Sequence, residues 1–393
     1  MLLPLCYNGG EGDIPQMTRR ATKYKTIVET LSGEILSGRY GKPMSFPSVA
    51  RIVRRFGVAH LTAVKALDEL KQMGLIRSRQ GAGSYVTSGA SKVFGLIVPA
   101  YSEIEFFPFL CQSISSLCQR KMRPLLFADT SSLSESELGV RLPEIARSFV
   151  EQRVAGVIFH PIDFCATANE LNRKVADIFL EADIPLVLVD CDMVHPPDVG
   201  GFDVVGIDNV AVGWQLGRHV LSQGARRILF VSHLQEFSFN VRLRCVGVKT
   251  AVVECAGADF LGSVGLEKPE GFSAMLKRRR PDAIVCSSDQ VAARTLKLLT
   301  DLGVRVPGDV LLAGVNDLSF ATVTSPALTT IHQPCRDIAQ TAFDALEFRL
   351  ANPSAPVRRI FLPAPLVVRA STQCESDALQ TSKDGFKKKR DRK

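Results

Sequence analysis

Apolar residues recur at helical spacing in three stretches near the start of the chain. Residues 18–38, 46–56 and 60–73 each place apolar side chains three or four positions apart, which predicts three helices. The predicted inward faces consist of Ile27, Val28, Leu31 and Ile35, then Val49, Ile52, Val53 and Phe56, and then Leu61, Val64, Leu67 and Leu70. Two short runs on either side of the glycine turn at 80–83 predict a hairpin. Three helices followed by a hairpin indicate a winged helix-turn-helix.

A different pattern occupies residues 93–371, where continuous Val, Ile and Leu runs alternate with amphipathic segments. The strand-like runs lie at 93–99, 123–128, 154–160, 186–190, 204–207, 228–232, 283–287 and 310–315. Runs of this kind, separated by helices, are typical of parallel strands that are buried on both faces, so we expect a doubly wound α/β fold. The number of runs exceeds one comfortable sheet and favours two lobes.

The chain is therefore expected to contain two domains with flanking segments. The expected parts are a disordered extension at 1–17, the winged helix at 18–87, a flexible linker at 88–92, the two-lobed domain at 93–371 and a basic disordered tail at 372–393. We expect the first lobe to comprise about 93–195 and 334–358, and the second about 196–333 and 359–371.

The net charge of +8 is unevenly distributed along the chain. Residues 18–87 carry 13 Lys and Arg against 4 Asp and Glu, whereas residues 88–381 have a net charge of −4. A basic small domain joined to an acidic large one points to a polyanionic partner for the small domain, although a solvated basic face is an equally simple reading. The basic tail is interpreted either as a further non-specific DNA contact or as inert.

Several classes of protein are disfavoured by what the sequence lacks. The ten cysteines are scattered without a Cys-x-x-Cys pair, which indicates reduced, core-filling thiols in a cytoplasmic protein and no metal site. Neither a membrane-spanning apolar run nor a signal peptide is evident. Gly-x-Ser-x-Gly, Walker-type and His-Glu-x-x-His motifs are missing as well, so we expect no enzyme and no cofactor.

Residues 23–87 resemble the GntR family of bacterial regulators. The resemblance is carried by Lys23-Tyr24, Gly38-Arg39-Tyr40, Phe46-Pro47-Ser48, Phe56-Gly57-Val58, Thr62, Ala66-Leu67-Asp68-Glu69-Leu70, Gly74-Leu75-Ile76 and Gly81-Ala82-Gly83-Ser84-Tyr85-Val86. It implies that the third helix enters the major groove of double-stranded operator DNA, with phosphate contacts around it, and that the hairpin approaches a groove closely as the wing. The residues it places at DNA are Ser48, Arg51, His60, Thr62, Lys65, Arg77, Arg79, Gln80 and Gly81.

This chain departs from the family at two basic positions. Val49-Ala50 follow Ser48 where Glu-Arg is common, and Ala59-His60 replace the usual Ser-Arg pair before the third helix. A regulator with a degenerate DNA-binding domain is therefore an alternative hypothesis.

Residues 93–371 resemble the effector domains of LacI-type repressors, which share the fold of periplasmic sugar-binding proteins. The stretches that carry the resemblance include Phe94–Pro99, Gly156–Phe159, Ile184–Asp190, Val205–Asn209 with Gly213, Gly224–Ile228, Arg242–Arg244 with Gly247, Ser288–Ala292 and Leu328–Pro334. A GntR-type headpiece on such a domain is the layout of arabinose-type repressors. The resemblance implies a small-molecule effector, a sugar or a sugar derivative, bound between the lobes of a homodimer.

The resemblance also implies which residues contact the effector, and each has a structural alternative. The candidates are Phe106, Phe107, Asp190, Arg244, Asp289 and Gln333. Arg244 and Asp289 could instead pair with each other, and either phenylalanine could belong to the core. Asp208 and Asn209 are interpreted as caps of the following helix, which contains Trp214.

The two resemblances together imply a transcription regulator, and the family resemblance alone implies a repressor rather than an activator. A solute-binding protein of the same fold is the remaining alternative.

Overall fold

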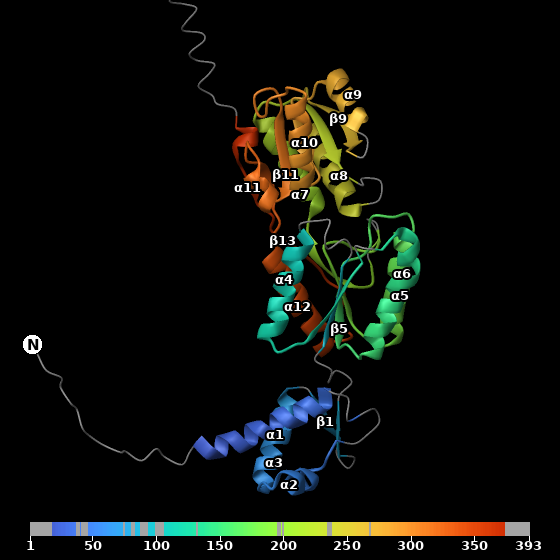
Figure 1. Ribbon diagram of the computed structural model, residues 1–393, viewed down its shortest axis with the longest axis vertical. Coiled ribbons are helices and arrows are strands. Elements are labelled where there is room, and N and C mark those ends of the chain that lie inside the picture. Colours follow the sequence, from blue (N-terminus) through green and yellow to red (C-terminus); the bar gives the residue numbers. More distant parts are fainter. Residues whose placement is uncertain are drawn as a thin grey trace, which may run out of the picture. The chain divides into compact units, whose positions relative to one another are not determined.

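The computed structural model shown in Figure 1 describes residues 18–36, 40, 46–73, 75–79, 83–86, 93–98, 106–130, 133–194, 198, 200–233, 238–266 and 269–373. The expected extension at 1–17, the linker at 88–92 and all but the first two residues of the basic tail lie outside the described residues. The chain divides into two compact units, residues 1–92 and 93–393.

The first unit consists of three helices and a hairpin. The helices are α1 (Thr18–Leu36), α2 (Val49–Phe56) and α3 (His60–Gln72), and the antiparallel strands are β1 (Ile76–Arg79) and β2 (Gly83–Val86). Ser48 caps α2 by accepting a hydrogen bond from the Arg51 amide, and Gly57 ends that helix at φ +60°, a conformation that glycine adopts without strain. The buried core joins Leu31 of α1, Ile52 of α2 and Leu70 of α3.

One of the residues predicted to face this core does not. Leu61 is 80% exposed. The helix begins at His60, so Leu61 lies in its first turn, whereas Ala63, Ala66 and Leu67 supply the buried side of α3.

The first sheet of the second unit is parallel throughout, with the strand order β13-β7-β6-β5-β3-β4. Its strands are β3 (Phe94–Val98), β4 (Leu125–Asp129), β5 (Gly156–Phe159), β6 (Leu186–Val189), β7 (Asp203–Ile207) and β13 (Arg359–Leu362). Helices α4 (Phe106–Arg120) and α12 (Cys335–Ala351) pack together, and so do α5 (Glu135–Glu151) and α6 (Ala168–Glu181). The two pairs cover opposite faces of the sheet, as Figure 1 shows.

The second sheet has the order β14-β12-β11-β10-β8-β9 and is parallel except for β14. Its strands are β8 (Arg227–Ser232), β9 (Asp259–Gly265), β10 (Ala283–Cys286), β11 (Leu311–Asn316), β12 (Thr329–His332) and β14 (Leu366–Val367). Helices α7 (Asn209–Ser222) and α8 (Phe239–Val253) bury one face, and α9 (Pro269–Arg279) and α10 (Asp289–Asp301) bury the other. A short helix α11 (Ser319–Val323) and a 3-10 turn at Ala370–Thr372 complete this lobe.

The fold class is as predicted, but the boundaries between the lobes differ from those expected. Strand β7 pairs with β6, so the first lobe continues through Ile207 instead of ending near residue 195. Strand β13 pairs with β7 and also belongs to the first lobe, although residues 359–362 were expected in the second. The chain thus crosses between the sheets after β7, after β12 and after β13.

The expected tail begins too early by at least one residue. Thr372 is fully buried, and its hydroxyl lies 2.7 Å from that of Thr329 and 2.8 Å from His219 Nε2. These hydrogen bonds attach the segment to the second lobe.

Two further observations concern the described residues only. Eight cysteines are free, and six of these are buried. Among the described helices, none combines the length and apolar character that crossing a bilayer requires.

Candidate functional site

The carboxyl ends of the strands in both sheets meet around Asp190. This residue follows β6 in the first lobe with φ +71°, and its carboxylate turns towards the second lobe. It accepts hydrogen bonds from Asn240 Nδ2 in α8 and from Gln333 Nε2 at the second crossover, each at 2.7 Å. Asp190 therefore connects both lobes and one of the segments between them.

His160 provides the charged partner of Asp190 within the first lobe. Its Nε2 lies 3.4 Å from the Asp190 carboxylate and its Nδ1 lies 2.8 Å from the Pro161 carbonyl oxygen. Because both ring nitrogens face acceptors, the arrangement favours the imidazolium. Burial lowers the pKa of His160, but the hydrogen bond and charge of Asp190 outweigh this and raise it. Burial raises the pKa of Asp190, yet His160 brings it below its ordinary value.

A second contact between the lobes lies beside the first. Ser238 Oγ, directly before α8, donates a 2.8 Å hydrogen bond to Asp163 Oδ2 in the first lobe. Burial raises the pKa of Asp163, and the nearby His160 only partly opposes this rise. Asp163 also lines a cavity of about 160 Å³ between the β5–α6 segment and the start of α8, together with Arg242 and Asp192.

Arg244 is buried in the second lobe, near these polar residues. Its Nε donates to Asn209 Oδ1 and its Nη1 donates to the Ser287 carbonyl oxygen, both at 2.7 Å. The position depends on the close packing of α7 and α8, because a Cβ atom at Gly213 would lie 1.9 Å from the Arg244 carbonyl oxygen. Burial lowers the pKa of Arg244, and Asp190, Asp289 and Asp163 oppose that shift.

Asp289 is the first residue of α10 and is 1% exposed. Its Oδ1 accepts a hydrogen bond from Thr330 Oγ1 and its Oδ2 accepts one from the Asp317 amide, both at 2.7 Å. Burial raises its pKa to about 6, although these hydrogen bonds act in the opposite direction. No direct hydrogen bond or ion pair joins Asp289 to Arg244 in the described structure, so the pairing considered as an alternative is not observed.

The two phenylalanine candidates lie at the start of α4 and are both 3% exposed. They belong to the hydrophobic core, and the edge of one ring faces the other at a centroid distance of 5.6 Å. Phe107 also stacks edge-to-face on His160 at 4.7 Å. The structure thus brings Phe107 beside the polar cluster through His160.

Several cluster members were not among the predicted residues. Asn209 is buried and donates to Asn240 Oδ1 at 2.9 Å, instead of acting as a helix cap. Asp208, by contrast, caps α7 as predicted. His160 and Asp163 could have been found, because His160 ends a predicted strand, as Asp190 does, and Asp163 lies three residues beyond it.

In the first unit, the described DNA candidates are exposed or half-buried around α2 and α3. Ser48, Arg51, His60 and Lys65 are exposed, and Thr62 is half-buried. The Lys65 ammonium lies 5.3 Å from the centre of the Tyr24 ring. Gln80 and Gly81 lie outside the described residues, and only the backbone of Arg77 and Arg79 is described, in β1.

Arg55, on the same short helix as Arg51, is used internally. Its guanidinium forms an ion pair with Glu34 of α1, which also accepts a hydrogen bond from the Tyr40 hydroxyl at 2.6 Å. This contact attaches α2 to α1 and leaves Arg51 as the basic side chain in the first turn of α2.

The two units define a class of protein in which a helix-turn-helix domain is joined to a two-lobed α/β domain with a polar cleft. Residues 23–86 match the gntR family of bacterial regulatory proteins, and residues 218–372 match the periplasmic binding protein-like domain. The chain thus combines a GntR-type helix-turn-helix domain with a periplasmic-binding-protein-like domain.

Relatives that match over most of the chain are transcriptional repressors. The chain is 25% identical over 370 residues to the arabinose metabolism transcriptional repressor of Geobacillus stearothermophilus, covering 89% of this chain and 98% of the relative. It is 26% identical to the HTH-type transcriptional repressor PurR of Vibrio atlanticus, covering 78% and 87%. A LacI family transcriptional regulator from Enterococcus faecium with bound ribose has the same fold, with a TM-score of 0.58 and 21% identity over 71% of this chain and 98% of that one.

Proposed function

We propose that the protein is a transcriptional repressor that binds operator DNA through residues 18–87 and a sugar or sugar derivative between the two lobes of residues 93–371. The observation that carries the proposal is the convergence on Asp190 of side chains from both lobes and from a crossover segment. A ligand that binds there stabilises one arrangement of the lobes over others, which is the requirement for an effector to control a distant site. Two findings support this proposal: the similar fold of a LacI family regulator with bound ribose, and the similarity in sequence to transcriptional repressors.

Repression in this proposal requires binding and release of DNA, not catalysis, and it takes place in the cytoplasm. We propose a homodimer as the acting form, because two winged helices then read two operator half-sites, and a change in the lobes alters their spacing. Oligomeric state is measured by sedimentation with and without effector.

The effector part of the proposal is tested by thermal shift of the full chain against a panel of sugars and nucleosides. Binding to the folded state raises the melting temperature by mass action. We expect Asp289→Asn to abolish the shift produced by the best compound. Asp301→Asn is the matched control, because Asp301 ends the same helix and forms an exposed ion pair with Lys297. Loss of the shift in both variants, or in neither, contradicts the placement of the site.

The DNA part is tested by selecting bound sequences from a random duplex pool and measuring affinity for the selected site. Lys65→Ala should weaken binding about tenfold at every sequence and lower the salt dependence by about one counterion, as loss of a phosphate contact does. Lys71→Ala is the control, because Lys71 lies at the other end of α3 and pairs with Asp68 at 3.0 Å. Failure to enrich any sequence would favour a degenerate DNA-binding domain.

The exposed position of Leu61 adds a distinct expectation. A leucine in the first turn of a helix that lies in the major groove can contact a thymine methyl group. Leu61→Ala should therefore relax the preference at one base position of the selected site, whereas Lys65→Ala should leave that preference unchanged.

A further inference from the structure

We propose that the second lobe carries its own binding surface for the phosphate backbone of double-stranded DNA, at the end of the lobe opposite the cleft. The surface, called the basic end below, consists of Arg226, Arg227, Lys277, Arg278, Arg279 and Arg280. It belongs to the two-lobed unit and is separate from the DNA contact proposed for residues 18–87. It gives the protein a second contact with DNA that does not depend on the base sequence.

The fold brings the two basic segments of this surface together. Arg227 begins β8, and Asp282 directly precedes the parallel neighbour β10. Asp282 Oδ2 accepts hydrogen bonds from the Arg226 and Arg227 amides, both at 2.9 Å. The Arg227 guanidinium donates to the carbonyl oxygen of Arg279, the last residue of α9. The start of β8 and the end of α9 therefore form one continuous surface.

This surface is not part of the effector site. The basic end lies at the amino ends of β8 and β10, whereas Asp289 and the rest of the cleft lie at the carboxyl ends of the strands. The four residues of β10 alone separate the two ends by about 13 Å, at about 3.3 Å per residue. A ligand of the size of a sugar in the cleft does not reach the basic end.

Basic side chains at the end of a helix have a simple structural role, because they complement the helix dipole and its free carbonyl groups. At the end of α9 other donors already serve these carbonyl groups. The Arg279 carbonyl accepts from the Arg227 guanidinium, and the Leu276 carbonyl accepts from the Arg280 amide at 2.9 Å. The side chains of residues 277–280 are exposed and make no hydrogen bond or ion pair with any described residue. Their four charges exceed what the helix end requires.

Neighbouring acidic residues do not balance the charge of the basic end. Asp259 lies opposite Arg227 in the pairing of β8 with β9, and Asp282 lies beside Arg226 and Arg227. Against six positive charges, these two carboxylates leave an excess of four. The guanidinium groups of Arg226 and Arg227 donate to backbone carbonyl oxygens, which carry no net charge and neutralise nothing.

The rest of the large unit makes this excess more distinctive. Residues 88–381 have a net charge of −4 although they include the basic end. Exposed charges act over a Debye length of about 8 Å at physiological ionic strength. A polyanion is therefore attracted to the basic end itself and not to the surrounding surface.

The composition of the basic end fits a phosphate backbone better than a protein partner. The core of a protein interface contains large apolar and aromatic side chains. Among the described residues, none of the exposed large hydrophobic side chains belongs to residues 222–227 or 271–282. Five of the six basic residues are arginines, whose planar guanidinium groups bind phosphate oxygens in pairs. Phosphate contacts carry no sequence information, so we expect binding to duplexes of any sequence.

The test measures binding of a random-sequence duplex to the full-length protein by fluorescence anisotropy over a range of NaCl concentrations. Arg51→Ala and Lys65→Ala are present throughout, so that the contribution of the first unit is reduced. The basic-end variant carries Lys277→Gln, Arg278→Gln and Arg279→Gln as well. Each lost phosphate contact lowers the slope of log K against log salt concentration by about 0.9. We expect the slope to fall by about two to three and the affinity at about 50 mM NaCl to fall at least tenfold.

A matched control removes the same net charge elsewhere in the large unit. It carries Arg141→Gln, Lys174→Gln and Lys297→Gln, three exposed cations that each pair with a carboxylate on their own helix. An equal loss in both variants would assign the effect to net charge, and no loss in the folded basic-end variant would show that this surface does not contact DNA. Either result overturns the proposal. If the triple variant fails to fold, Arg278→Gln alone replaces it, with an expected fall in slope of about one.

Other polyanions distinguish DNA from the remaining partners of a basic surface. The same variants are titrated with polyglutamate and with vesicles that contain phosphatidylserine. If the basic-end variant loses affinity for one of these while its affinity for DNA is unchanged, the proposal is overturned and the surface is assigned to an acidic protein or to a membrane. Operator selection by residues 18–87 is measured separately, so that the proposed function stands or fails independently of these results.

Discussion

Two buried carboxylates in the first lobe, Asp203 and Asp190, differ in how their charge is balanced. Asp203 begins β7, whereas Asp190 follows the neighbouring β6, so the two lie at opposite ends of the same parallel sheet. Asp203 accepts hydrogen bonds from two arginines, and Asp190 accepts from two uncharged amide groups and one histidine. A carboxylate that arginines fully neutralise can hold the fold together, whereas a carboxylate with mostly uncharged donors remains able to exchange them for a ligand.

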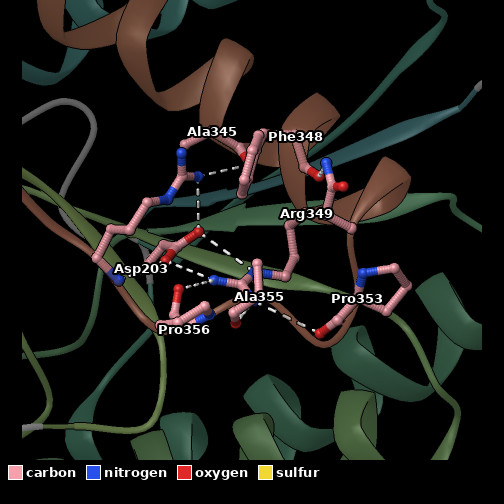
Figure 2. A network of polar contacts seen from close by, with 9 residues as sticks. Asp203, Ala345, Phe348, Arg349, Pro353, Ala355 and Pro356 are labelled. Carbon is pink, nitrogen blue, oxygen red and sulfur yellow. Dashed lines mark hydrogen bonds and ion pairs between the residues drawn. The ribbon is translucent and has the colours of Figure 1, made fainter.

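Figure 2 shows the network around Asp203. Arg349 Nη2, near the end of α12, lies 2.7 Å from Asp203 Oδ1, and Arg358 Nη2 lies 3.0 Å from Oδ2. The Arg358 amide donates to the same carboxylate at 2.7 Å, and its guanidinium lies 4.0 Å from the centre of the Phe348 ring. Arg349 also donates to the carbonyl oxygens of Ala355 and Pro356. The network thus fixes the path from α12 to β13.

The largest expected effect is on stability at Asp203. Asp203→Asn leaves two arginines without a balancing charge, and breaking a buried ion pair in this way costs about 3–5 kcal/mol. Asp190→Asn keeps an uncharged acceptor for Asn240 and Gln333, and His160, unlike an arginine, can release its proton when the balancing charge is removed. This change should therefore cost only about 1 kcal/mol. Unfolding by urea, followed by circular dichroism, measures both. Equal losses would mean that the two carboxylates play the same structural part.

Acidification should change the free energy of unfolding in opposite directions through Asp289 in the cleft and through Asp203. Burial raises the pKa of Asp289 to about 6, so between about pH 6 and 4 the folded state binds more protons than the unfolded state. Acidification through that range therefore stabilises the fold, by about 2–3 kcal/mol for a shift of about two units. The pKa of Asp203 is lowered because its arginine hydrogen bonds outweigh burial, so its contribution is instead lost as the pH falls below about 4.

Because other groups titrate over the same range, the informative quantity is a difference between variants. The free energy of unfolding is measured from pH 7 to pH 3 for the original protein and for Asp289→Asn. As the pH falls from 6 to 4, we expect the free energy of unfolding of the original protein to rise relative to that of the variant. Parallel curves would show that Asp289 is ionised with an ordinary pKa in the folded protein.

The sequence places candidate residues at strand ends, because the rule for parallel sheets is local. The structure brings two of these, Asp190 and Gln333, into contact, and their binding of an effector stays a prediction. His160 and Asp163 were within reach of the same rule. The partners of Asp203 could not be predicted by this rule. Arg349 and Arg358 lie far along the chain, and only the return of β13 to the first sheet brings them close to Asp203.

The predictions that the structure corrects are those that depend on contacts between residues far apart in the sequence. The apolar run at 204–207 identifies β7 as a buried strand, but nothing in the run itself indicates which of two sheets it joins. Leu61 shows the same limit at smaller scale. Its helical spacing fits the inward face, yet its place in the first turn puts it beyond the core that Ala63 and Leu67 reach.

The smallest expected effect concerns the uncharged contact between the lobes. Ser238→Ala removes the 2.8 Å hydrogen bond to Asp163, and a bond of this kind contributes about 1 kcal/mol or less to stability. Ser113→Ala is the control, because the Ser113 hydroxyl bonds only to the Phe109 carbonyl within its own helix and should contribute almost nothing. If the contact between the lobes is exchangeable, Ser238→Ala should change the effector Kd by less than tenfold while Asp163→Ala weakens binding much more. A loss at Ser238 as large as that at Asp203 would show instead that the cleft is held closed as rigidly as the arginine network.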